Sequence, residues 1–426
     1  MDNNAKKIEL LQKKTSFVGI DIAKRTHYAS LINQQGLPIK VGLKISNNRD
    51  GLNFLQGKLG HIDKSTMLIG MEPTGQYWKC IAYDLQKNGY DIVLTNPFHV
   101  NRSKEIRDNK NTKNDTKDSL LIAHLIREGK FLNTLLLDGI YADLREYTKL
   151  REQLKKELSR VKIQLKTLLD EFLPEYENCF SVVIIKTSLA LLKAYGLRGL
   201  GTGNDFTDKI DLIIKISKRK IKSEKAETIV KLLASTIGIQ EGINGAESSL
   251  KSLIRRIEFY QSEIYEVEEK MKENLEKTEE AKYMLTVPGI GHVTAAMFLG
   301  QTGSLKKFKN PKQLEKLAGM DLTENSSGQF RGKKHLSKRG RDLLRHTLYL
   351  MAIAAIAHDN EFKKLYEYKV KVCKKAKMMV VVEIMLKILN VIFAVTKHKI
   401  DYKGESIFER LPKTQQQEID FLHRSQ

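Results

Sequence analysis

The first third of the chain alternates apolar runs of strand length with amphipathic stretches. Two apolar runs, the β-branched Ser16–Ala23 and then Ser65–Glu72, have the length of buried strands, and each carries an acid near its end. The strand-like segments "HYASLINQQ" and "PIKVGLKIS" follow the first run and are separated by the turn Gly36-Leu37-Pro38. This pattern predicts three strands before the second buried run.

Helical segments separate the remaining strands. "NNRDGLNFLQGKLG" places Leu52, Leu55 and Leu59 at helical spacing after capping residues. "GQYWKCIAYDLQKNG" predicts a helix that ends at Gly89, and "DIVLTNP" predicts a strand that ends at Pro97. The resulting order of three strands, helix, strand, helix, strand and helix is that of a ribonuclease H-like (RuvC-like) α/β fold.

The middle of the chain is helical. From Tyr147 onwards, apolar residues recur mostly three or four apart, at Leu150, Leu154, Leu158, Val161, Leu165, Leu168 and Phe172. From Leu250 the spacing alternates strictly between three and four, at Leu253, Ile257, Tyr260, Ile264, Val267 and Met271. This seam of about three heptads predicts an antiparallel helical hairpin or a dimerising coiled coil, with an amphipathic helix on a globular core as the alternative. We expect both segments to mediate self-association.

The composition fits a cytoplasmic protein of two or three domains. The chain has 426 residues, of which 41% are hydrophobic, so it is too long for one small domain and too apolar for a disordered chain. Cys80, Cys179 and Cys373 lie far apart, which excludes a disulfide framework and a cysteine-based zinc site. Residues 1–14 are polar and lack the apolar core of a signal peptide. We therefore expect a reducing, cytoplasmic environment.

The charge favours a polyanionic partner. The chain has 73 Lys and Arg against 51 Asp and Glu, a formal net charge of +22. Nucleic acid is the first candidate and an anionic membrane surface is the second, while a solvated lysine-rich surface needs no partner. The most apolar stretch, 378–395, carries Glu383 and Lys387 four residues apart, which suits a helix packed inside protein. We therefore expect no membrane span.

Four acids form the first candidate site. Asp21 and Glu72 come at the ends of two predicted strands, whereas Asp115 and Asp118 lie three apart on one face of a predicted helix. Four converging carboxylates repel one another unless cations neutralise them. Oxygen ligands in this number suit Mg²⁺ or Mn²⁺, in the two-metal arrangement that serves phosphoryl transfer. The alternative for Asp115 and Asp118 is that they cap the helix and favour its dipole.

The second candidate site is the glycine pair of "PGIG". Gly289 and Gly291 precede a predicted helix over 294–299. Glycine lets the backbone approach a phosphate closely, and a helix N-terminus offers free N–H groups. The pattern is similar to the turn of a helix-hairpin-helix element, which binds nucleic-acid backbone without sequence preference. A plain tight turn is the alternative.

Two cationic segments complete the candidate sites. A Gly-, Ser-, Lys- and Arg-rich loop is predicted at 324–340, and its cations continue into the next helix, at Arg331, Lys333, Lys334, Lys338, Arg339, Arg341 and Arg345. The second cluster lies in the helical segment 181–245, at Lys215, Lys218, Arg219, Lys220, Lys222 and Lys225. We expect both segments to bind the backbone of RNA or DNA, with an affinity that falls steeply with salt.

The first of these segments also holds two serines. Ser326 and Ser327 precede Gly328 in the predicted loop. A serine hydroxyl near several cations could attack a phosphodiester, because the cations stabilise the alkoxide and the charge on phosphorus. The alternative is that Ser-Gly simply forms a turn.

Five motifs occur in the order seen in one family: "GIDIAK", "MEPTGQYW", "NDTKDSLLIA", "LTVPGIGHVTA" and "LAGMDLTENSSGQFRGKKHLSKRGRDLLRHTLY". The chain resembles the insertion-sequence-110 family of DEDD-type transposases, which are related to pilin-gene invertases. The motifs cover residues 17–130 and 283–358. The resemblance implies a RuvC-like domain with a metal-binding tetrad and a C-terminal domain with a nucleophilic serine. These functions map onto Asp21, Glu72, Asp115, Asp118 and Ser327.

The resemblance also implies partners. Family members use a guide RNA, encoded by the mobile element, whose loops pair with target and donor DNA. They exchange strands through a serine–phosphate linkage as dimers or tetramers, and the tetrad of one protomer meets the serine domain of another across helical coiled-coil segments. Segment 181–245 matches no motif of the family, and Ser327 is preferred to Ser326 because it adjoins Gly328.

These expectations define three domains and a leading function. We expect a RuvC-like metal-dependent domain at 1–130, a helical coiled-coil region with a basic insertion at 131–280, and a mostly helical transposase domain with a helix-hairpin-helix-like element at 281–426. The leading hypothesis is an RNA-guided, Mg²⁺-dependent DNA recombinase in the prokaryotic cytoplasm, associated with the nucleoid. A structure-selective nuclease of the Holliday-junction type would need the acids but not the serine loop. A non-catalytic nucleic-acid-binding assembly protein would need only the charge and the coiled coil.

Overall fold

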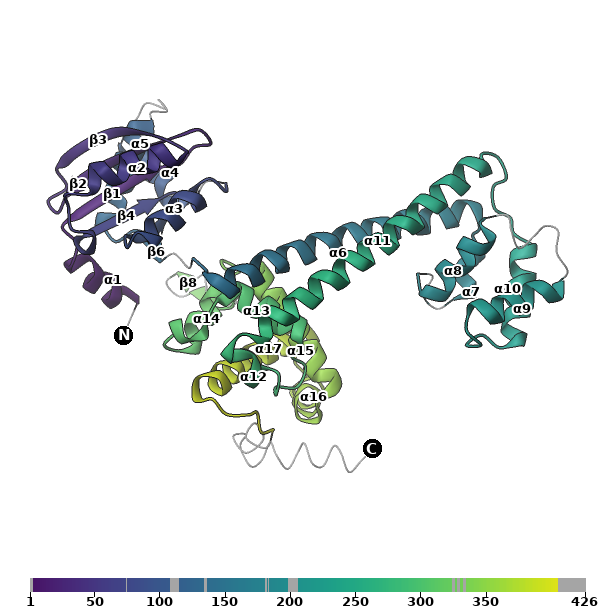
Figure 1. The fold of residues 1–426 in the computed structure, drawn as a ribbon. Helices are drawn as coiled ribbons and strands as arrows, with labels where there is room; N and C mark the ends of the chain where they lie inside the picture. The colour runs from purple at the N-terminus through teal and green to yellow at the C-terminus, as the bar shows by residue number, and fades with distance from the viewer. Residues whose placement is uncertain are drawn as a thin grey trace. The chain divides into compact units, whose positions relative to one another are not determined.

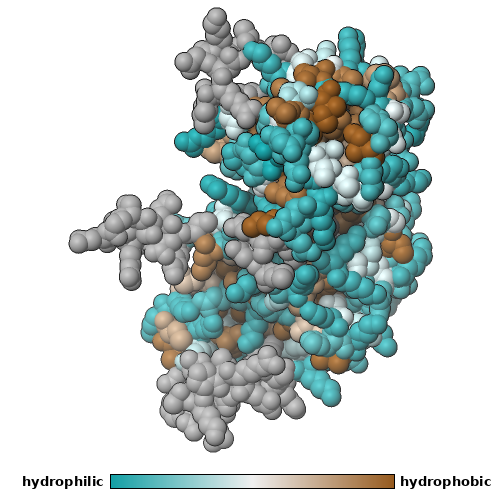
Figure 2. Space-filling model, turned by 90° about the vertical axis from the view of Figure 1, so that its left-hand side faces the viewer, coloured by the Kyte–Doolittle hydropathy of each residue, from teal (hydrophilic) through white to brown (hydrophobic). Residues whose placement is uncertain are grey.

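The computed structural model describes residues 3–73, 75–107, 115–133, 136–180, 182, 184–197, 206–323, 326–327, 330–331 and 335–404. The chain folds into two compact units, Met1–Leu136 and Leu137–Gln426. A mixed sheet with helices forms the first unit and helices form most of the second, as the sequence predicts (Figure 1). Hydrophilic side chains cover most of the face drawn in Figure 2, with hydrophobic patches between them.

A six-stranded sheet forms the first unit, in the order β3-β2-β1-β4-β5-β6. Its strands are β1 Ser16–Asp21, β2 Thr26–Asn33, β3 Pro38–Ser46, β4 Met67–Met71, β5 Asp91–Thr95 and β6 Phe131–Asn133. β2 is antiparallel to both β1 and β3, β4 and β5 run parallel to β1, and β6 is antiparallel to β5. The predicted order of three strands, helix, strand, helix, strand and helix is confirmed, and β6 and the N-terminal helix are additions to it.

Helices cover both faces of this sheet. They are α1 Asn3–Gln12, α2 Arg49–Leu59, α3 Trp78–Lys87, α4 Pro97–Arg107 and α5 Asp115–Arg127, with a short 3-10 turn at Lys64–Thr66. One face buries Val18 and Ile20 with side chains of α2 and α3. The opposite face buries Phe17 and Leu68 with side chains of α5, and α1 packs there too. Neighbouring residues of β1 therefore alternate between two separate cores.

Two long helices form an antiparallel hairpin in the second unit. They are α6 Gly139–Phe172 and α11 Ile243–Glu276. Arg151 donates a hydrogen bond to Glu268 over 2.7 Å, near the start of α6 and the end of α11. Arg256 donates one to Gln164 over 3.3 Å, so the pairing moves backwards along α11 as it moves forwards along α6.

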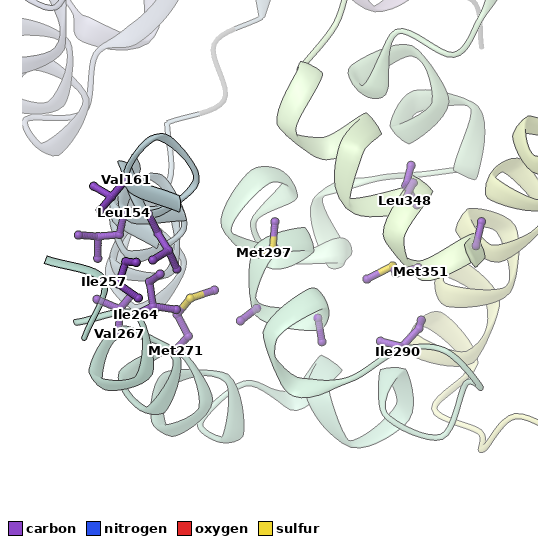
Figure 3. Close-up of a cluster of buried hydrophobic side chains, with 14 of the residues drawn as sticks. Leu154, Val161, Ile257, Ile264, Val267, Met271, Ile290, Met297, Leu348 and Met351 are labelled. Atoms are coloured by element: carbon purple, nitrogen blue, oxygen red, sulfur yellow. The ribbon is translucent and has the colours of Figure 1, made fainter. Parts of the chain in front are cut away.

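The heptad seam of α11 closes this hairpin. Ile257 is fully buried and Ile264 is 6% exposed. Figure 3 shows both beside Leu154 and Val161, which come from α6. Of the predicted alternatives, the antiparallel hairpin within one chain is therefore correct. This corrects the expectation that Ile257 and Ile264 face another protomer, because α6 of the same chain already fills the seam. Leu150 also departs from the predicted stripe, since it is 42% exposed.

A small group of helices joins the two arms of the hairpin, and we call it the tip (residues 173–242). Its helices are α7 Tyr176–Cys179, α8 Lys186–Tyr195, α9 Phe206–Ile216 and α10 Ser223–Ala234. The buried Tyr176 hydroxyl donates to the Ser188 carbonyl over 2.8 Å and ties α7 to α8. The Ile239 N–H donates to the Glu171 carbonyl over 3.1 Å, which brings the chain back beside the end of α6.

The remaining helices pack against one another, and α12 and α13 pack against the hairpin. They are α12 Glu279–Met284, α13 His292–Thr302, α14 Pro311–Ala318, α15 Asp342–His358, α16 Asn360–Glu367 and α17 Lys377–His398, with short turns at Leu305–Lys307 and Tyr368–Val372. Two-residue strands lie between α14 and α15: β7 Leu322–Thr323, β8 Ser326–Ser327, β9 Phe330–Arg331 and β10 His335–Leu336. They form antiparallel pairs, β7 with β10 and β8 with β9, where the sequence predicts only a loop.

Helix α17 is long and apolar enough to cross a membrane by length and composition, and half of its most apolar window is buried in the structure. It packs against α12, α14, α15 and α16, as a core helix does. Its acid Glu383 pairs with Lys369, and also with Lys375 over 2.7 Å. Burial acts to raise the pKa of Glu383, but the hydrogen bonds from both lysines outweigh it and hold this pKa below its usual range.

Candidate active site

Strand register brings Asp21 and Glu72 together at one edge of the sheet. Asp21 is the last residue of β1, and Glu72 directly follows β4. The two strands pair in parallel with Ile20 opposite Met71, so Asp21 and Glu72 occupy the next neighbouring positions. Both side chains are half-buried. The prediction that these two acids end adjacent strands is confirmed.

Both acids belong to the face of the sheet that α5 covers. Alternation along β1 puts Asp21 on the same face as Gly19, and alternation along β4 puts Glu72 on the same face as Gly70. A β-carbon on Gly19 would lie only 2.2 Å from the Ser119 carbonyl oxygen of α5. The absence of a side chain at this position is what allows α5 to rest directly on β1.

Helix α5 begins with the other two acids. Asp115 is its first residue and is half-buried, and Asp118 follows one turn later with 8% of its surface exposed. The next residue, Ser119, shares a hydrogen bond of 2.7 Å with the hydroxyl of Ser30 in β2. This bond fixes the first turn of α5 against the sheet. Acids in a first turn also favour the helix dipole, so capping and ligand roles are compatible here.

The four acids fit a divalent cation by donor chemistry, since carboxylates offer the hard oxygen ligands that Mg²⁺ and Mn²⁺ prefer. The register of β1 and β4 and the seat of α5 set them on one face of the sheet. Within the part of the chain that the structure describes, however, no three His, Cys, Asp or Glu side chains are grouped closely enough to hold an ion. The backbone thus brings the acids to one face, and their side chains do not form a closed ligand shell.

His27 supports this edge of the sheet and was not predicted from the sequence. It is fully buried in β2, and its Nδ1 accepts a hydrogen bond of 3.2 Å from the Ala23 N–H, two residues after Asp21. Burial lowers the pKa of His27, although a hydrogen bond with Asn47 acts in the opposite direction. The neutral imidazole therefore anchors the turn that follows Asp21. A lone histidine in "RTHYAS" gave no signal of this role.

Replacing Gly19 with alanine should loosen the site through α5. The new methyl group would meet backbone atoms of Ser119 and Ala123 at 2.2 and 2.3 Å, so the helix must move away from β1. We expect a loss of about 1–3 kcal/mol in the free energy of unfolding, as for other overpacked cores. Urea denaturation measures this loss.

Gly57→Ala is the matched control for that measurement. Gly57 lies inside α2, and a β-carbon there would meet nothing within 4 Å. Alanine should therefore stabilise the unit by about 0.5–1 kcal/mol. Equal stability of the two variants would contradict the close packing of α5 on β1.

The "PGIG" turn joins α12 to α13. Gly289 has a φ of +82°, and a β-carbon there would lie 2.4 Å from the amide nitrogen of Ala355 in α15. Gly289 is therefore required for packing within the unit. Gly291 is exposed, and its N–H donates to the Thr294 hydroxyl over 3.1 Å at the start of α13. A β-carbon on Gly291 would meet nothing within 4 Å, so of the two glycines this one borders open space.

The cations at 338–345 divide into two kinds. Arg341 donates to a backbone carbonyl of α13, and Arg345 donates to one of α14 over 2.9 Å, so both hold the unit together. Lys338 and Arg339 are exposed and lie just before α15. Of these four predicted nucleic-acid-binding residues, Lys338 and Arg339 are the ones whose charge faces solvent.

Both candidate serines lie on β8. Ser326 pairs with Arg331 and Ser327 with Phe330 in the antiparallel β8–β9 pair. The backbone thus sets Arg331 across from Ser326 and puts Ser327 at the end of the strand. The side chains of both serines and of Arg331, together with residues 328, 333 and 334, lie outside the described residues, so Lys333 and Lys334 have no structural account.

An α/β unit with acids at adjacent strand ends, followed by a helical unit with exposed cations, is typical of an enzyme that acts on nucleic acid. Two family models match the chain. A DEDD-type model described as "Transposase" matches residues 18–174, and the model "Transposase IS116/IS110/IS902 family" matches residues 281–367. The chain belongs to the IS110 family of insertion-sequence transposases.

Individual relatives agree with this assignment. The chain is 22% identical over 407 residues to an uncharacterized 42 kDa protein of insertion element IS900 from Mycobacterium paratuberculosis, covering 91% of this chain and 96% of the relative. It is 22% identical to the transposase for IS1111A from Coxiella burnetii, covering 63% of this chain and 61% of the relative. A pilin gene-inverting protein from Moraxella lacunata is 30% identical over 115 residues, covering 25% of this chain and 33% of the relative.

Family membership establishes the general chemistry. Transposases act on DNA, and the family implies an enzyme that cleaves DNA and transfers strands. The DEDD-type domain indicates dependence on a divalent metal. The structure adds Gly19 and Gly70 to the residues that shape the site. They precede Asp21 and Glu72 by two residues, and their lack of a side chain lets α5 pack closely on this face of the sheet. The repeated Gly-x-acid pattern was the available sequence signal for these two glycines.

Proposed function

We propose that the chain is an RNA-guided DNA recombinase of an insertion sequence, which cuts and exchanges strands with a Mg²⁺-binding acid tetrad and a serine nucleophile. The observation that carries this proposal is the register of β1 and β4, which pairs Ile20 with Met71 and so puts Asp21 and Glu72 in neighbouring positions, on the face where α5 begins with Asp115 and Asp118. The order β3-β2-β1-β4-β5, with β2 antiparallel, supports a RuvC-like fold for this unit.

The tetrad and the serine have different roles in this proposal. Asp21, Glu72, Asp115 and Asp118 would hold Mg²⁺. When bound, Mg²⁺ would supply positive charge that offsets the negative charge growing on the scissile phosphate. The Ser327 hydroxyl oxygen loses its proton to solvent and attacks phosphorus, and the bond to the leaving deoxyribose oxygen breaks. The leaving oxygen takes up a proton from solvent, and the chain keeps one DNA end as a phosphoserine ester. Exposed cations such as Lys338 and Arg339 neutralise the flanking phosphates.

Oligomers and a guide RNA complete the proposal. A dimer or tetramer would let the acids of one protomer act with Ser327 of another. The hairpin seam is filled within one chain, so such an assembly uses other surfaces. The exposed N-terminus of α13 at Gly291 and the exposed cations Lys338 and Arg339 before α15 offer contacts to nucleic-acid backbone.

A RuvC-like nuclease of the Holliday-junction type is the second candidate. It needs only the acids at the strand ends, and the same register supports it. It differs in its product, because water rather than serine attacks the phosphate and no protein–DNA linkage forms.

RNA guidance is tested with purified protein, Mg²⁺, and donor and target DNA. We expect recombination only when RNA transcribed from the DNA flanking the gene is added, because the proposed guide pairs with both DNA partners. Changing the guide loop that pairs with the target should redirect insertion to the matching new site. Efficient recombination at one fixed site without any RNA would contradict guidance while leaving the transposase assignment intact.

A further inference from the structure

The loop between α9 and α10, with the adjoining ends of both helices, carries a cluster of exposed positive charge. We call it the tip cation cluster, and it consists of Lys215, Lys218, Arg219, Lys220, Lys222 and Lys225. All six side chains are exposed, and in the described part of the chain none of them forms an ion pair. Neighbouring tip cations behave differently, since Lys193 and Lys231 both pair with glutamates. Segment 215–225 holds these six cations and one acid, Glu224, so the like charges repel one another and an anionic partner would stabilise the cluster.

The loop presents these charges on a fixed backbone. The Ser217 hydroxyl accepts a hydrogen bond from the Ile221 N–H over 3.2 Å, and both residues are buried beneath the loop. The Arg219 N–H donates to the Ile214 carbonyl over 2.9 Å. Lys218 and Arg219 have φ values of +53° and +61°, a conformation that glycine and asparagine adopt more easily. Two long cations thus occupy positions where backbone preference alone would select other residues.

The side chains of the cluster indicate which anion they fit. Phe206 is the sole aromatic residue between 206 and 234, and it lies at the far end of α9. Single-stranded nucleic acid is usually held by bases stacked on several aromatic rings, which this surface does not offer. The same stretch contains no Asn or Gln to read base edges. A surface of lysines and one arginine instead suits the closely spaced phosphates of a duplex.

A hollow between the tip and α11 is lined by further cations. It has a volume of about 490 Å³ and is lined by Lys193 and Tyr195 of the tip and by Lys251 and Arg255 of α11. Lys251 and Arg255 lie one turn apart and are exposed. Glu247 also lines this hollow and accepts a hydrogen bond from the Leu197 N–H. Cations at the tip are therefore not confined to the α9–α10 loop.

We propose that the tip cation cluster docks the chain onto the phosphate backbone of duplex DNA without sequence preference. Duplex DNA is the chosen partner because the chain belongs to a family that acts on DNA. This inference rests on that family assignment and is independent of the serine and of RNA guidance. The cluster supplies non-specific affinity that holds DNA near the protein, while the acid tetrad performs the chemistry.

The test uses the full chain and a labelled DNA duplex of unrelated sequence. The variant carries Lys218→Asn, Arg219→Asn and Lys220→Gln, because asparagine tolerates the left-handed backbone and should preserve the loop. The control carries Lys270→Gln, Lys272→Gln and Lys277→Gln, which remove the same charge from exposed positions near the end of α11. Thermal unfolding should show that both variants are folded.

Salt dependence gives the readout. Each phosphate contact contributes about −0.9 to the slope of log affinity against log salt. If the variant loses three such contacts, the parent chain should lose about 40-fold more affinity than the tip variant between roughly 50 and 200 mM salt. The control should follow the parent chain. Matching slopes for the tip variant and the control would overturn the proposal.

Competition and cleavage assays separate the other outcomes. Unlabelled duplex DNA should displace the labelled duplex better than single-stranded DNA or duplex RNA does. Preferential displacement by RNA, with the tip variant defective in RNA binding alone, would overturn the assignment to DNA. An Asp21→Asn chain should bind the duplex with the parent slope, so failure of the catalytic proposal and failure of the docking proposal give different results.

Discussion

A Ser327→Ala chain should form no covalent adduct with DNA under conditions in which the parent chain does. The hydroxyl oxygen is the proposed nucleophile, and alanine leaves no atom in its place that can bond to phosphorus. The adduct stores the energy of the broken phosphodiester, so the strands can be rejoined without an external energy source. We therefore expect recombination to fall below detection together with the adduct. Denaturing gel electrophoresis of a labelled suicide substrate measures the adduct directly.

Ser326→Ala is the matched control, since it removes the neighbouring hydroxyl from the same strand β8. It should keep at least part of the adduct, because strand pairing sets Ser327, not Ser326, at the end of β8 beside residue 328. Digesting a trapped complex and identifying the DNA-linked peptide by mass spectrometry assigns the attachment point. Linkage to Ser326 or to a tyrosine would contradict the assignment, and cleavage with no linkage would favour the Holliday-junction type of nuclease.

The spacing of apolar and polar residues predicts the first unit well, because most of its strands and helices are long enough to show a regular spacing. β1 and β4 are apolar runs with acids at their ends, and helical spacing with capping residues marks α2. β6 has three residues, too few for any period, and its place depends on pairing with β5. Helix α1 lies in a polar stretch and is held by distant groups, since Lys7 donates to the Phe131 carbonyl over 2.6 Å.

The second unit shows where periodicity is insufficient. The heptads of α11 predict a partner helix but do not identify it, because α6 and a second chain would present the same apolar stripe. The structure selects α6 through contacts such as Arg151 with Glu268. The two-residue strands around Ser327 are too short to carry a period, and they form through pairing with one another.

Among the candidate site residues, too, local pattern predicts some positions and tertiary packing decides the others. The acids at strand ends were predictable, because parallel strands bring their ends to one edge of a sheet. The sequence could not predict which cations hold the unit together and which face solvent. Arg341 and Arg345 have the same charge as Lys338 and Arg339 and differ only in what surrounds them. Their bonds to carbonyls of α13 and α14 arise from tertiary packing. His27 was missed for the same reason, since its neighbours come from the turn after β1.

Asp21→Asn and Glu72→Gln should each abolish strand cleavage in Mg²⁺. Each change keeps the shape of the side chain and removes one of the charged oxygens proposed to hold the ion. We expect each variant to lose several kcal/mol of transition-state stabilisation. At about 1.4 kcal/mol for each factor of ten, this loss decreases the rate by roughly a thousandfold or more. Asp50→Asn is the control, because Asp50 is an exposed acid in the first turn of α2 in the same unit. It should cleave at nearly the parent rate.

Thermal unfolding with and without Mg²⁺ distinguishes a lost ligand from a lost fold. In the parent chain, Mg²⁺ binds the folded state and should raise the melting temperature, whereas in both variants the increase should be much smaller. Without Mg²⁺ both variants should unfold near the melting temperature of the parent, because each change keeps the shape of the side chain. A variant that keeps the full Mg²⁺-dependent increase and the parent cleavage rate would show that its acid is not a ligand. If the four acids hold Mg²⁺ as proposed, both variants should have normal stability, bind the duplex and fail to cleave it.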